Sequence, residues 1–445
     1  MKNYLLRLLV QSMICSFFPL LMNAQLVGTQ KVKIGQEILL VVPQEYIEGD
    51  VQYDWEWWFF TPSYVEMRSA DNVYKRYVTL TEECRNEKQV TVRFEYKYLK
   101  GVNEFLTSLW WILEIEKDEV EDGVEINSTN FPDNNFRNYL LEQEYGKDGL
   151  LTDSEIKGIN VLSVEEKNIS SLKGIEYLYA LVYLGCSGNQ LTSLDISRNT
   201  ALETLYCGSN KLTSLDVSKN TELYHLSFYD NQLSSIDVSK NTALTELDCS
   251  RNQLTTLDVS KNTALTELRC QINQLTSLNL QKNTALINLN CAGNQLTSLI
   301  VSENTTLTEL WCVYNQLSSL DVSRSTALTR LGCSNNLLTS LDISRNTALI
   351  HLDCSSNMLS SLYSSKSTVL KELFCINNQL TSLDVSKNTA LKELNCSNNH
   401  IASLKLSETG ALEVLHCCRN KIKDAAMDAL IASLPRNNTE SKHDI

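Results

Sequence analysis

The 445-residue chain has little proline, little glycine and only five histidines. Its 5 prolines and 15 glycines are too few for a collagen-like or broadly disordered chain. The chain has fewer basic than acidic residues, with 39 Lys and Arg and 53 Asp and Glu, so we expect no nucleic-acid-binding surface. The histidines have no constant acidic partner or nucleophile beside them, and the sequence therefore predicts neither an enzyme nor a cofactor.

Long apolar runs are missing after the N-terminal segment, so no membrane span is expected. Residues 1–24 carry two basic residues followed by a largely apolar run, Leu8 to Leu21, and are interpreted as a signal peptide. A membrane anchor is one alternative, although Pro19 interrupts the short run. Lipid attachment at Cys15 is another. The signal peptide predicts a secreted or cell-surface protein.

One stretch of sequence, NTALTELDCSRNQLTTLDVSK at 241–261, recurs every 21 residues over more than half of the chain. A fixed period of this length predicts a solenoid whose coils pack on their neighbours. Each coil is expected to give a short strand to a parallel sheet on the concave face, and an extended or 3₁₀ segment to the back. The predicted solenoid covers residues 159–422. Its coils are marked by Asn189, Asn210, Asn231, Asn252, Asn273, Asn294, Asn315, Asn336, Asn357, Asn378, Asn399 and Asn420.

Two repeated positions are predicted to be structural. Cysteine occupies one of them eleven times, as at Cys249 and Cys270, and Phe228 fills it once, which indicates apolar filling. Buried, reduced thiols are therefore expected, with scattered disulfides or metal capture as alternatives. The asparagine three residues later, as at Asn252 and Asn273, is predicted to satisfy backbone groups inside the coil. Replacing Asn252 with Leu should cost on the order of 1–3 kcal/mol.

Residues 25–118 do not repeat and predict an all-β domain. The predicted strands are 31–34, 37–42, 51–57, 77–80, 89–98 and 109–116. Trp55, Cys84 and the alternating strand 90–96 resemble immunoglobulin-like domains that precede repeat regions in bacterial surface proteins. The resemblance implies an Ig-like β-sandwich. Its clustered aromatic residues are expected in the core, with a ligand-binding platform as the alternative. A spacer that holds the solenoid away from a surface is the simplest role for it.

Short helices are predicted at both ends of the solenoid. Residues 124–158 form a helical cap, with Asp133 capping one helix and Thr152 and Glu155 forming a capping box. The loop between its helices partly resembles an EF-hand, which makes Asp148 and Glu155 calcium candidates, although two ligand positions are poor. Residues 423–434 predict a C-terminal capping helix, and 435–445 a polar tail. Four residues of this helix are expected to cover the final coil: Ala425, Met427, Leu430 and Ile431.

The repeats of 241–261 resemble the leucine-rich repeats of secreted and surface proteins of Bacteroidetes, and are similar in plan to internalin-type repeats. The resemblance spans about 124–434. It implies a leucine-rich-repeat, right-handed solenoid that works in adhesion or protein binding. It supplies no catalytic residues.

Function is expected where a coil departs from the repeat at exposed strand positions. One such region holds Tyr183, Tyr206, His225 and Tyr229. The other holds Arg269, Ile272, Trp311, Val313, Tyr314, Arg330, Phe374 and Ile376. Gly332 is expected to leave the Trp311 ring exposed. Such aromatic and Arg residues dominate binding energy, so a protein or glycan partner is predicted. The alternatives are a structural module of the cell envelope, or single surface aromatics without a role. The sequence does not indicate an oligomeric state.

Overall fold

The computed structural model describes residues 123–407 and 411–434 in full, and only the strand backbone within 24–115 and at 442–444. The chain forms two compact units, Met1–Asp122 and Gly123–Ile445, which we describe separately. The predicted signal peptide, Cys84 and the aromatic side chains of the first unit lie outside the described residues.

The first unit contains seven described strands in two sheets. The strands are β1 (Ala24–Val32), β2 (Glu37–Val41), β3 (Asp54–Phe59), β4 (Val65–Ser69), β5 (Lys75–Leu80), β6 (Gln89–Lys100) and β7 (Asn103–Ile115). One sheet has the order β1-β7-β6-β3 and the other β2-β5-β4. Strand β4 was not predicted, β1 overlaps the predicted strand 31–34 only at 31–32, and the other five overlap their predicted ranges. The immunoglobulin-like identity of this unit stays a prediction.

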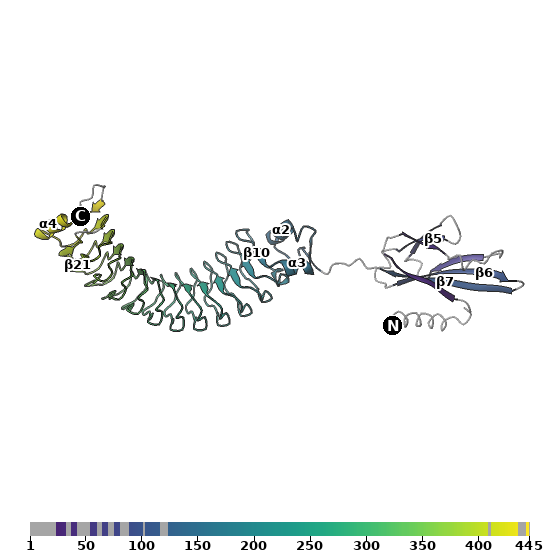
Figure 1. Ribbon diagram of the computed structural model, residues 1–445, viewed down its shortest axis with the longest axis horizontal. Helices are drawn as coiled ribbons and strands as arrows, with labels where there is room; N and C mark the ends of the chain where they lie inside the picture. The colour runs from purple at the N-terminus through teal and green to yellow at the C-terminus, as the bar shows by residue number, and fades with distance from the viewer. Residues whose placement is uncertain are drawn as a thin grey trace. The chain divides into compact units, whose positions relative to one another are not determined.

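The second unit is a solenoid whose coils stack in an arc, with α2 and α3 at one end and α4 at the other (Figure 1). One strand from each coil joins a 14-stranded sheet, in which the pairs are parallel. The strands in sheet order are β10 (Val161–Ser163), β11 (Tyr183–Gly185), β12 (Thr204–Tyr206), β13 (His225–Ser227), β14 (Glu246–Asp248), β15 (Glu267–Arg269), β16 (Asn288–Asn290), β17 (Glu309–Trp311), β18 (Arg330–Gly332), β19 (His351–Asp353), β20 (Glu372–Phe374), β22 (Glu393–Asn395), β24 (Val414–His416) and β25 (Lys442–Asp444).

The repeated apolar residues form one continuous core. In the coil 241–261, the central strand residue Leu247 and the following Cys249 both point inward and are buried. Leu244, Leu254 and Val259 are fully buried as well. Each buried leucine contributes about 1.5–3 kcal/mol, so every coil is held mainly by apolar contact with its neighbours. The solenoid prediction is confirmed.

The back of the solenoid consists mostly of turns. The first coil has a 3₁₀ helix, η4 (Ile175–Tyr177), and two late coils pair as β21 (Ser382–Asp384) and β23 (Ser403–Lys405). An exposed Asp commonly opens this segment and accepts a hydrogen bond from the backbone two residues later, as Asp258 does from Ser260 at 2.9 Å. Such local bonds compete with a helix, as the sequence predicted.

The predicted asparagine ladder is present. Asn252 Oδ1 accepts from the Leu233 N–H at 3.1 Å, and its Nδ2 donates to the carbonyls of Phe228 and Cys249 at 3.1 and 3.2 Å. One buried side chain thus bridges two coils. The same pattern recurs at Asn273, whose Oδ1 accepts from the Leu254 N–H at 2.9 Å.

A second asparagine ladder was not predicted. Asn262, on the back of the coil, is fully buried and donates through Nδ2 to the carbonyls of Val238 and Asn241 at 3.0 and 2.8 Å. Its Oδ1 finds no hydrogen-bond partner among the described residues. Serine replaces this asparagine at Ser325 and Ser367, which are buried too. The ladder joins the backs of successive coils as the first ladder joins their strand ends.

The N-terminal cap matches its prediction. It comprises β8 (Gly123–Glu125), α2 (Asn134–Glu142), β9 (Leu150–Thr152) and α3 (Asp153–Gly158). Asp133 Oδ1 caps α2 by accepting from the N–H groups of Asn135 and Phe136, while Oδ2 accepts from the Ser170 hydroxyl at 2.6 Å. The side chain therefore both starts the helix and fastens the cap to the first coil. Thr152 and Glu155 form the expected capping box.

The C-terminal helix is α4 (Ala425–Ser433), and its Leu430 is buried as predicted. The prediction that Ala425 and Ile431 also cover the final coil is wrong. Both are exposed, Ile431 by 51%. Met427 packs against the core as predicted, and Ala426 and Leu434 do so in place of the two exposed residues. Within the tail, β25 adds to the sheet beside β24.

Candidate binding surface

The exposed side of the sheet carries two rows of side chains in register. The first row contains the first residue of each strand of this sheet up to β24: Val161, Tyr183, Thr204, His225, Glu246, Glu267, Asn288, Glu309, Arg330, His351, Glu372, Glu393 and Val414. The second row contains the third: Ser163, Gly185, Tyr206, Ser227, Asp248, Arg269, Asn290, Trp311, Gly332, Asp353, Phe374, Asn395 and His416. Between the rows, the central leucines point into the core.

Trp311, His351 and Phe374 form an aromatic cluster across four coils. The ring centroids of Trp311 and His351 lie 5.6 Å apart, and those of His351 and Phe374 5.7 Å apart. These are favourable distances for tilted aromatic pairs. The sequence analysis assigned Trp311 and Phe374 to one candidate region but did not include His351. Contact between rings of different rows depends on the directions of the side chains, which the sequence does not give.

Gly332 has a different role from the one predicted. A Cβ atom on Gly332 would lie 2.4 Å from Cε3 of Trp311, so the indole rests on the glycine backbone. Trp311 is therefore half-buried, not fully exposed. Its Nε1–H donates to Glu309 Oε2 at 3.4 Å. Gly332 thus fixes the orientation of the ring by leaving room for it.

A shallow polar groove of about 200 Å³ lies beside Trp311 on the sheet surface. Its polar lining comes from three strands: Glu267, Arg269, Asn288, Asn290 and Glu309. Carboxylates, amides and an indole meet there, so the groove can accept hydrogen bonds and hold a cation or an apolar edge.

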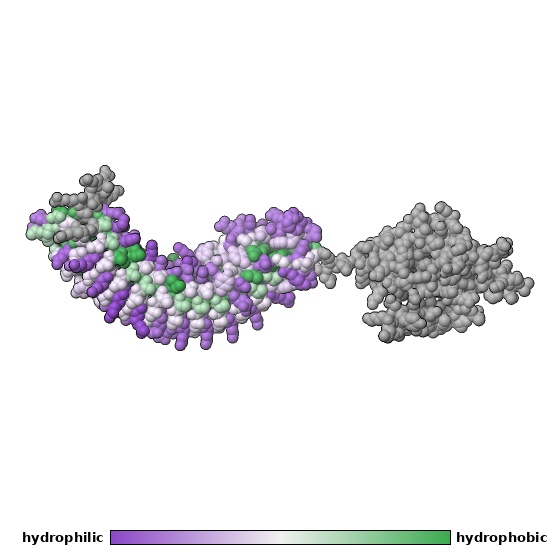
Figure 2. Space-filling model, viewed as in Figure 1, coloured by the Kyte–Doolittle hydropathy of each residue, from purple (hydrophilic) through white to green (hydrophobic). Residues whose placement is uncertain are grey.

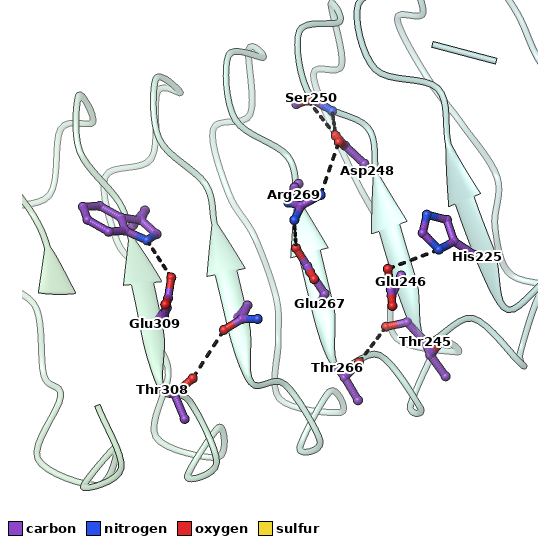
Figure 3. A network of polar contacts seen from close by, with 12 residues as sticks. His225, Thr245, Glu246, Asp248, Ser250, Thr266, Glu267, Arg269, Thr308 and Glu309 are labelled. Atoms are coloured by element: carbon purple, nitrogen blue, oxygen red, sulfur yellow. Dashed lines mark hydrogen bonds and ion pairs between the residues drawn. The ribbon is translucent and has the colours of Figure 1, made fainter. Parts of the chain in front are cut away.

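Ion pairs connect neighbouring coils along each of the two rows (Figure 3). Arg269 contacts Glu267 and lies 4.0 Å from Asp248, and His225 Nδ1 lies 3.1 Å from Glu246. Arg330, half-exposed, lies 3.7 Å from Glu309. Carboxylates nevertheless outnumber Arg side chains in the two rows, so this face carries negative charge.

A second aromatic cluster lies near the N-terminal end of the sheet. The rings of Tyr183 and Tyr206 are 5.7 Å apart, and those of Tyr206 and His225 are 4.6 Å apart. Tyr229 lies over Gly208, where a Cβ would be 2.2 Å from its ring. Three residues of the predicted region, Tyr183, Tyr206 and His225, therefore form a packed group of rings, and Tyr229 rests on Gly208.

Val313 and Tyr314 follow the C-terminal end of strand β17, in the turn that leaves the sheet. Tyr314 precedes the ladder residue Asn315, and its φ is 54°. The corresponding residue of every other coil also has positive φ, for example Ile272 at 57°. The sequence did not reveal this backbone rule, because only two of these positions, Gly188 and Gly293, hold glycine.

The cysteine ladder is buried and its thiols are free. Burial raises the pKa of Cys207 and Cys291 to about 12, so both are protonated at neutral pH and poorly reactive. At the cap, Glu155 is held by Thr152, and Asp148 accepts from the Leu150 N–H at 3.0 Å. Within 123–407 and 411–434, no group of three His, Cys, Asp or Glu side chains could hold a metal ion.

The fold and its repeats define a leucine-rich-repeat solenoid. The functional domain of InlJ from Listeria monocytogenes, which includes a cysteine ladder, is similar over 68% of this chain and 72% of that one, with 35% identity and a TM-score of 0.62. The internalin InlF from Listeria monocytogenes matches 72% of this chain and 98% of its own, with 25% identity and a TM-score of 0.61. The chain belongs to the internalin-like family of leucine-rich-repeat proteins. No family model matches it. No curated protein sequence matches it either.

Proposed function

We propose that this protein is a non-catalytic binding or adhesion module that recognises a protein partner on the exposed face of its sheet. The aromatic cluster of Trp311, His351 and Phe374 beside the polar groove carries the proposal. Half-buried aromatic side chains held by their neighbours are typical anchors of protein interfaces. The proposal also includes export through residues 1–24 and a place at the cell surface or outside the cell. The Bacteroidetes origin suggested by the repeats stays a prediction.

The membership of the family supports a protein partner. Across the described part of the chain, no helix combines the length and hydropathy needed to cross a bilayer. The parallel sheet offers a rigid array of side chains at fixed spacing, which suits the recognition of a large surface.

The test uses the full chain against arrays of extracellular proteins and of glycans. Trp311→Ala and Phe374→Ala should each weaken capture of the protein partner by roughly tenfold or more, since central aromatic anchors contribute most of the binding energy. Asn395→Ala, in the same row, is the matched control and should bind normally. Equal binding by all variants would show that the aromatic cluster is not the site.

A structural module of the cell envelope is the competing function. It predicts that deletion of residues 25–118 abolishes the association while both aromatic variants retain it. Capture of glycans alone would move the proposal from a protein to a carbohydrate partner.

A further inference from the structure

We propose that a second contact site lies near the N-terminal end of the sheet, and that it holds an arginine side chain of the protein partner. This tyrosine site consists of Tyr183, Tyr206 and Glu165, and is bordered by Tyr229. The inference rests on the proposed function, because the arginine belongs to the partner that contacts Trp311. Tyr206 and Trp311 lie in the same row, five coils apart, or about 24 Å at strand spacing, so one protein can span both sites.

The three tyrosines lie on a diagonal across the sheet. They are spaced 23 residues apart, which is one coil of 21 residues and two residues more. Because alternate residues of a strand point to the same face, each step moves one coil along the sheet and one row across it. Tyr183 starts β11, Tyr206 ends β12, and Tyr229 lies in a third row, which follows the cysteine ladder. Tyrosine occurs nowhere else in these three rows, so the diagonal is a local departure from the repeat.

Contacts within the fold hold the rings in place. The ring centroids of Tyr183 and Tyr206 lie 5.7 Å apart, and Tyr229 rests on Gly208, two residues after Tyr206. All three side chains are half-buried, so part of each ring stays open to solvent. Rings that are already fixed lose little conformational freedom on binding, and tyrosine is among the residues that dominate binding energy at interfaces.

An unpaired carboxylate lies beside these rings. Oε1 of Glu165 and Oη of Tyr183 each lie 3.1 Å from the position that a Cβ atom would take on Gly185, so both oxygens approach the same glycine. Glu165 is exposed and has no ion pair or hydrogen bond with any residue that the structure describes. Burial raises the pKa of the Tyr183 phenol, and the charge of Glu165 raises it further. The carboxylate therefore acts directly on the ring.

The charge balance around the site favours a cation. Over residues 161–230 the three rows contain no lysine or arginine, and Glu165 is their one carboxylate. His225 is already engaged, since its Nδ1 lies 3.1 Å from Glu246 Oε2 and 3.4 Å from Tyr206 Oη. In the polar groove, by contrast, arginine side chains of the chain itself accompany the carboxylates. The negative charge of the tyrosine site is thus left for a partner to match.

Arginine suits this arrangement better than lysine. A guanidinium is planar, stacks on aromatic faces and donates several hydrogen bonds in its plane, so it can bond to Glu165 and Tyr183 Oη while it covers the Tyr206 ring. An ammonium is a compact, strongly hydrated point charge. Figure 2 shows few strongly hydrophobic residues among mostly hydrophilic ones on the visible face of the solenoid, so a large apolar side chain would find less to match there.

Gly-Ser peptides that carry arginine, lysine or glutamine at the same positions test the inference. Surface plasmon resonance measures their binding to the immobilised full chain at physiological salt. The arginine peptide should bind about fivefold or more tightly than the lysine peptide, and the glutamine peptide should not bind. Tyr206→Ser, which leaves the net charge unchanged, and Glu165→Gln should each weaken arginine binding by about fivefold or more.

The matched controls are Tyr179→Ser and Glu222→Gln, which change exposed residues in turns on the back of the solenoid and should bind normally. Unfolding midpoints verify the fold of every variant. Glu165 is exposed, so Glu165→Gln keeps the fold and decides the outcome if Tyr206→Ser unfolds.

Three results would overturn the inference: no binding of the arginine peptide, equal binding of the arginine and lysine peptides, or normal arginine binding by a folded Tyr206→Ser or Glu165→Gln variant. The protein partner captured on the arrays separates the inference from the proposed function. If capture is lost with Trp311→Ala but kept with the two tyrosine-site variants, the second site is wrong and the proposed function stands. If no variant of either site loses capture, both are wrong.

Discussion

Replacing Asn252 with Leu tests how much of the stability depends on the first asparagine ladder. The substitution removes the acceptor of the Leu233 N–H and the donor to the carbonyls of Phe228 and Cys249, all buried. Only the Leu233 N–H is left without a partner, because the carbonyls of Phe228 and Cys249 keep bonds from Asn231 and Asn273. An orphaned buried N–H predicts a loss of about 1–3 kcal/mol, the range expected from the sequence.

The assay combines urea denaturation of the full chain with hydrogen exchange followed by mass spectrometry. Because a repeat array can unfold in parts, the local readout matters most. Peptides that contain Leu233 should exchange faster in Asn252→Leu, and the midpoint should fall. The control is Gln253→Leu, one residue further on, because its row already holds leucine at Leu337. An unchanged midpoint together with unchanged exchange around Leu233 would refute the bridging role of the ladder.

Three further predictions concern the cap, the second ladder and the cysteines. Partial burial alone would raise the pKa of Asp133, but hydrogen bonds from Ser170 and backbone N–H groups outweigh it and the pKa is lowered. The carboxylate therefore stabilises the fold above its unfolded pKa, and this is lost as pH falls through the lower folded pKa. Asp133→Ala should lose about 1 kcal/mol near neutral pH, and its deficit in urea midpoint should shrink below about pH 4. Asn262→Ser should change stability by less than about 1 kcal/mol, because Ser325 fills the same row, whereas Asn262→Leu should lose more in the same denaturation assay. Alkylation of the native chain should modify exposed Cys418 well before Cys291, as read by peptide mass spectrometry.

The period of the sequence was sufficient to predict the coil and its core. Residues equivalent to Leu247, Cys249 and Asn252 recur with fixed spacing, so a role could be assigned to each. The leucine and cysteine fill the core, and the asparagine binds buried backbone groups. The burial of Asn262 was missed because its neighbours in the sequence are Lys and Thr. Such a polar context does not distinguish a buried asparagine from a solvated one. Burial on the back depends on how consecutive coils stack, which the composition of a single coil does not reveal.

The candidate site was only partly predictable. Register could be read from the period, so Trp311 and Gly332 were correctly placed beside each other. The direction of the Trp311 indole could not be predicted from the period, because it depends on the rotamer and on the space that Gly332 leaves by having no Cβ. The prediction that Ile431 covers the final coil was wrong for a similar reason. Which face of a helix is buried depends on the angle at which the helix docks, and the sequence does not give that angle.

The separation of scaffold from surface explains how such a chain can carry strained residues. Each coil is held by its two neighbours through apolar contact and two asparagine ladders, so the conformation of Tyr314 is imposed by Asn315 and the adjoining coils, not by its own preference. A change of residue type there alters stability locally and leaves the register of the sheet in place. Exposed rows can therefore acquire aromatic or strained residues one coil at a time, and the loss of stability that accompanies a new contact surface stays local.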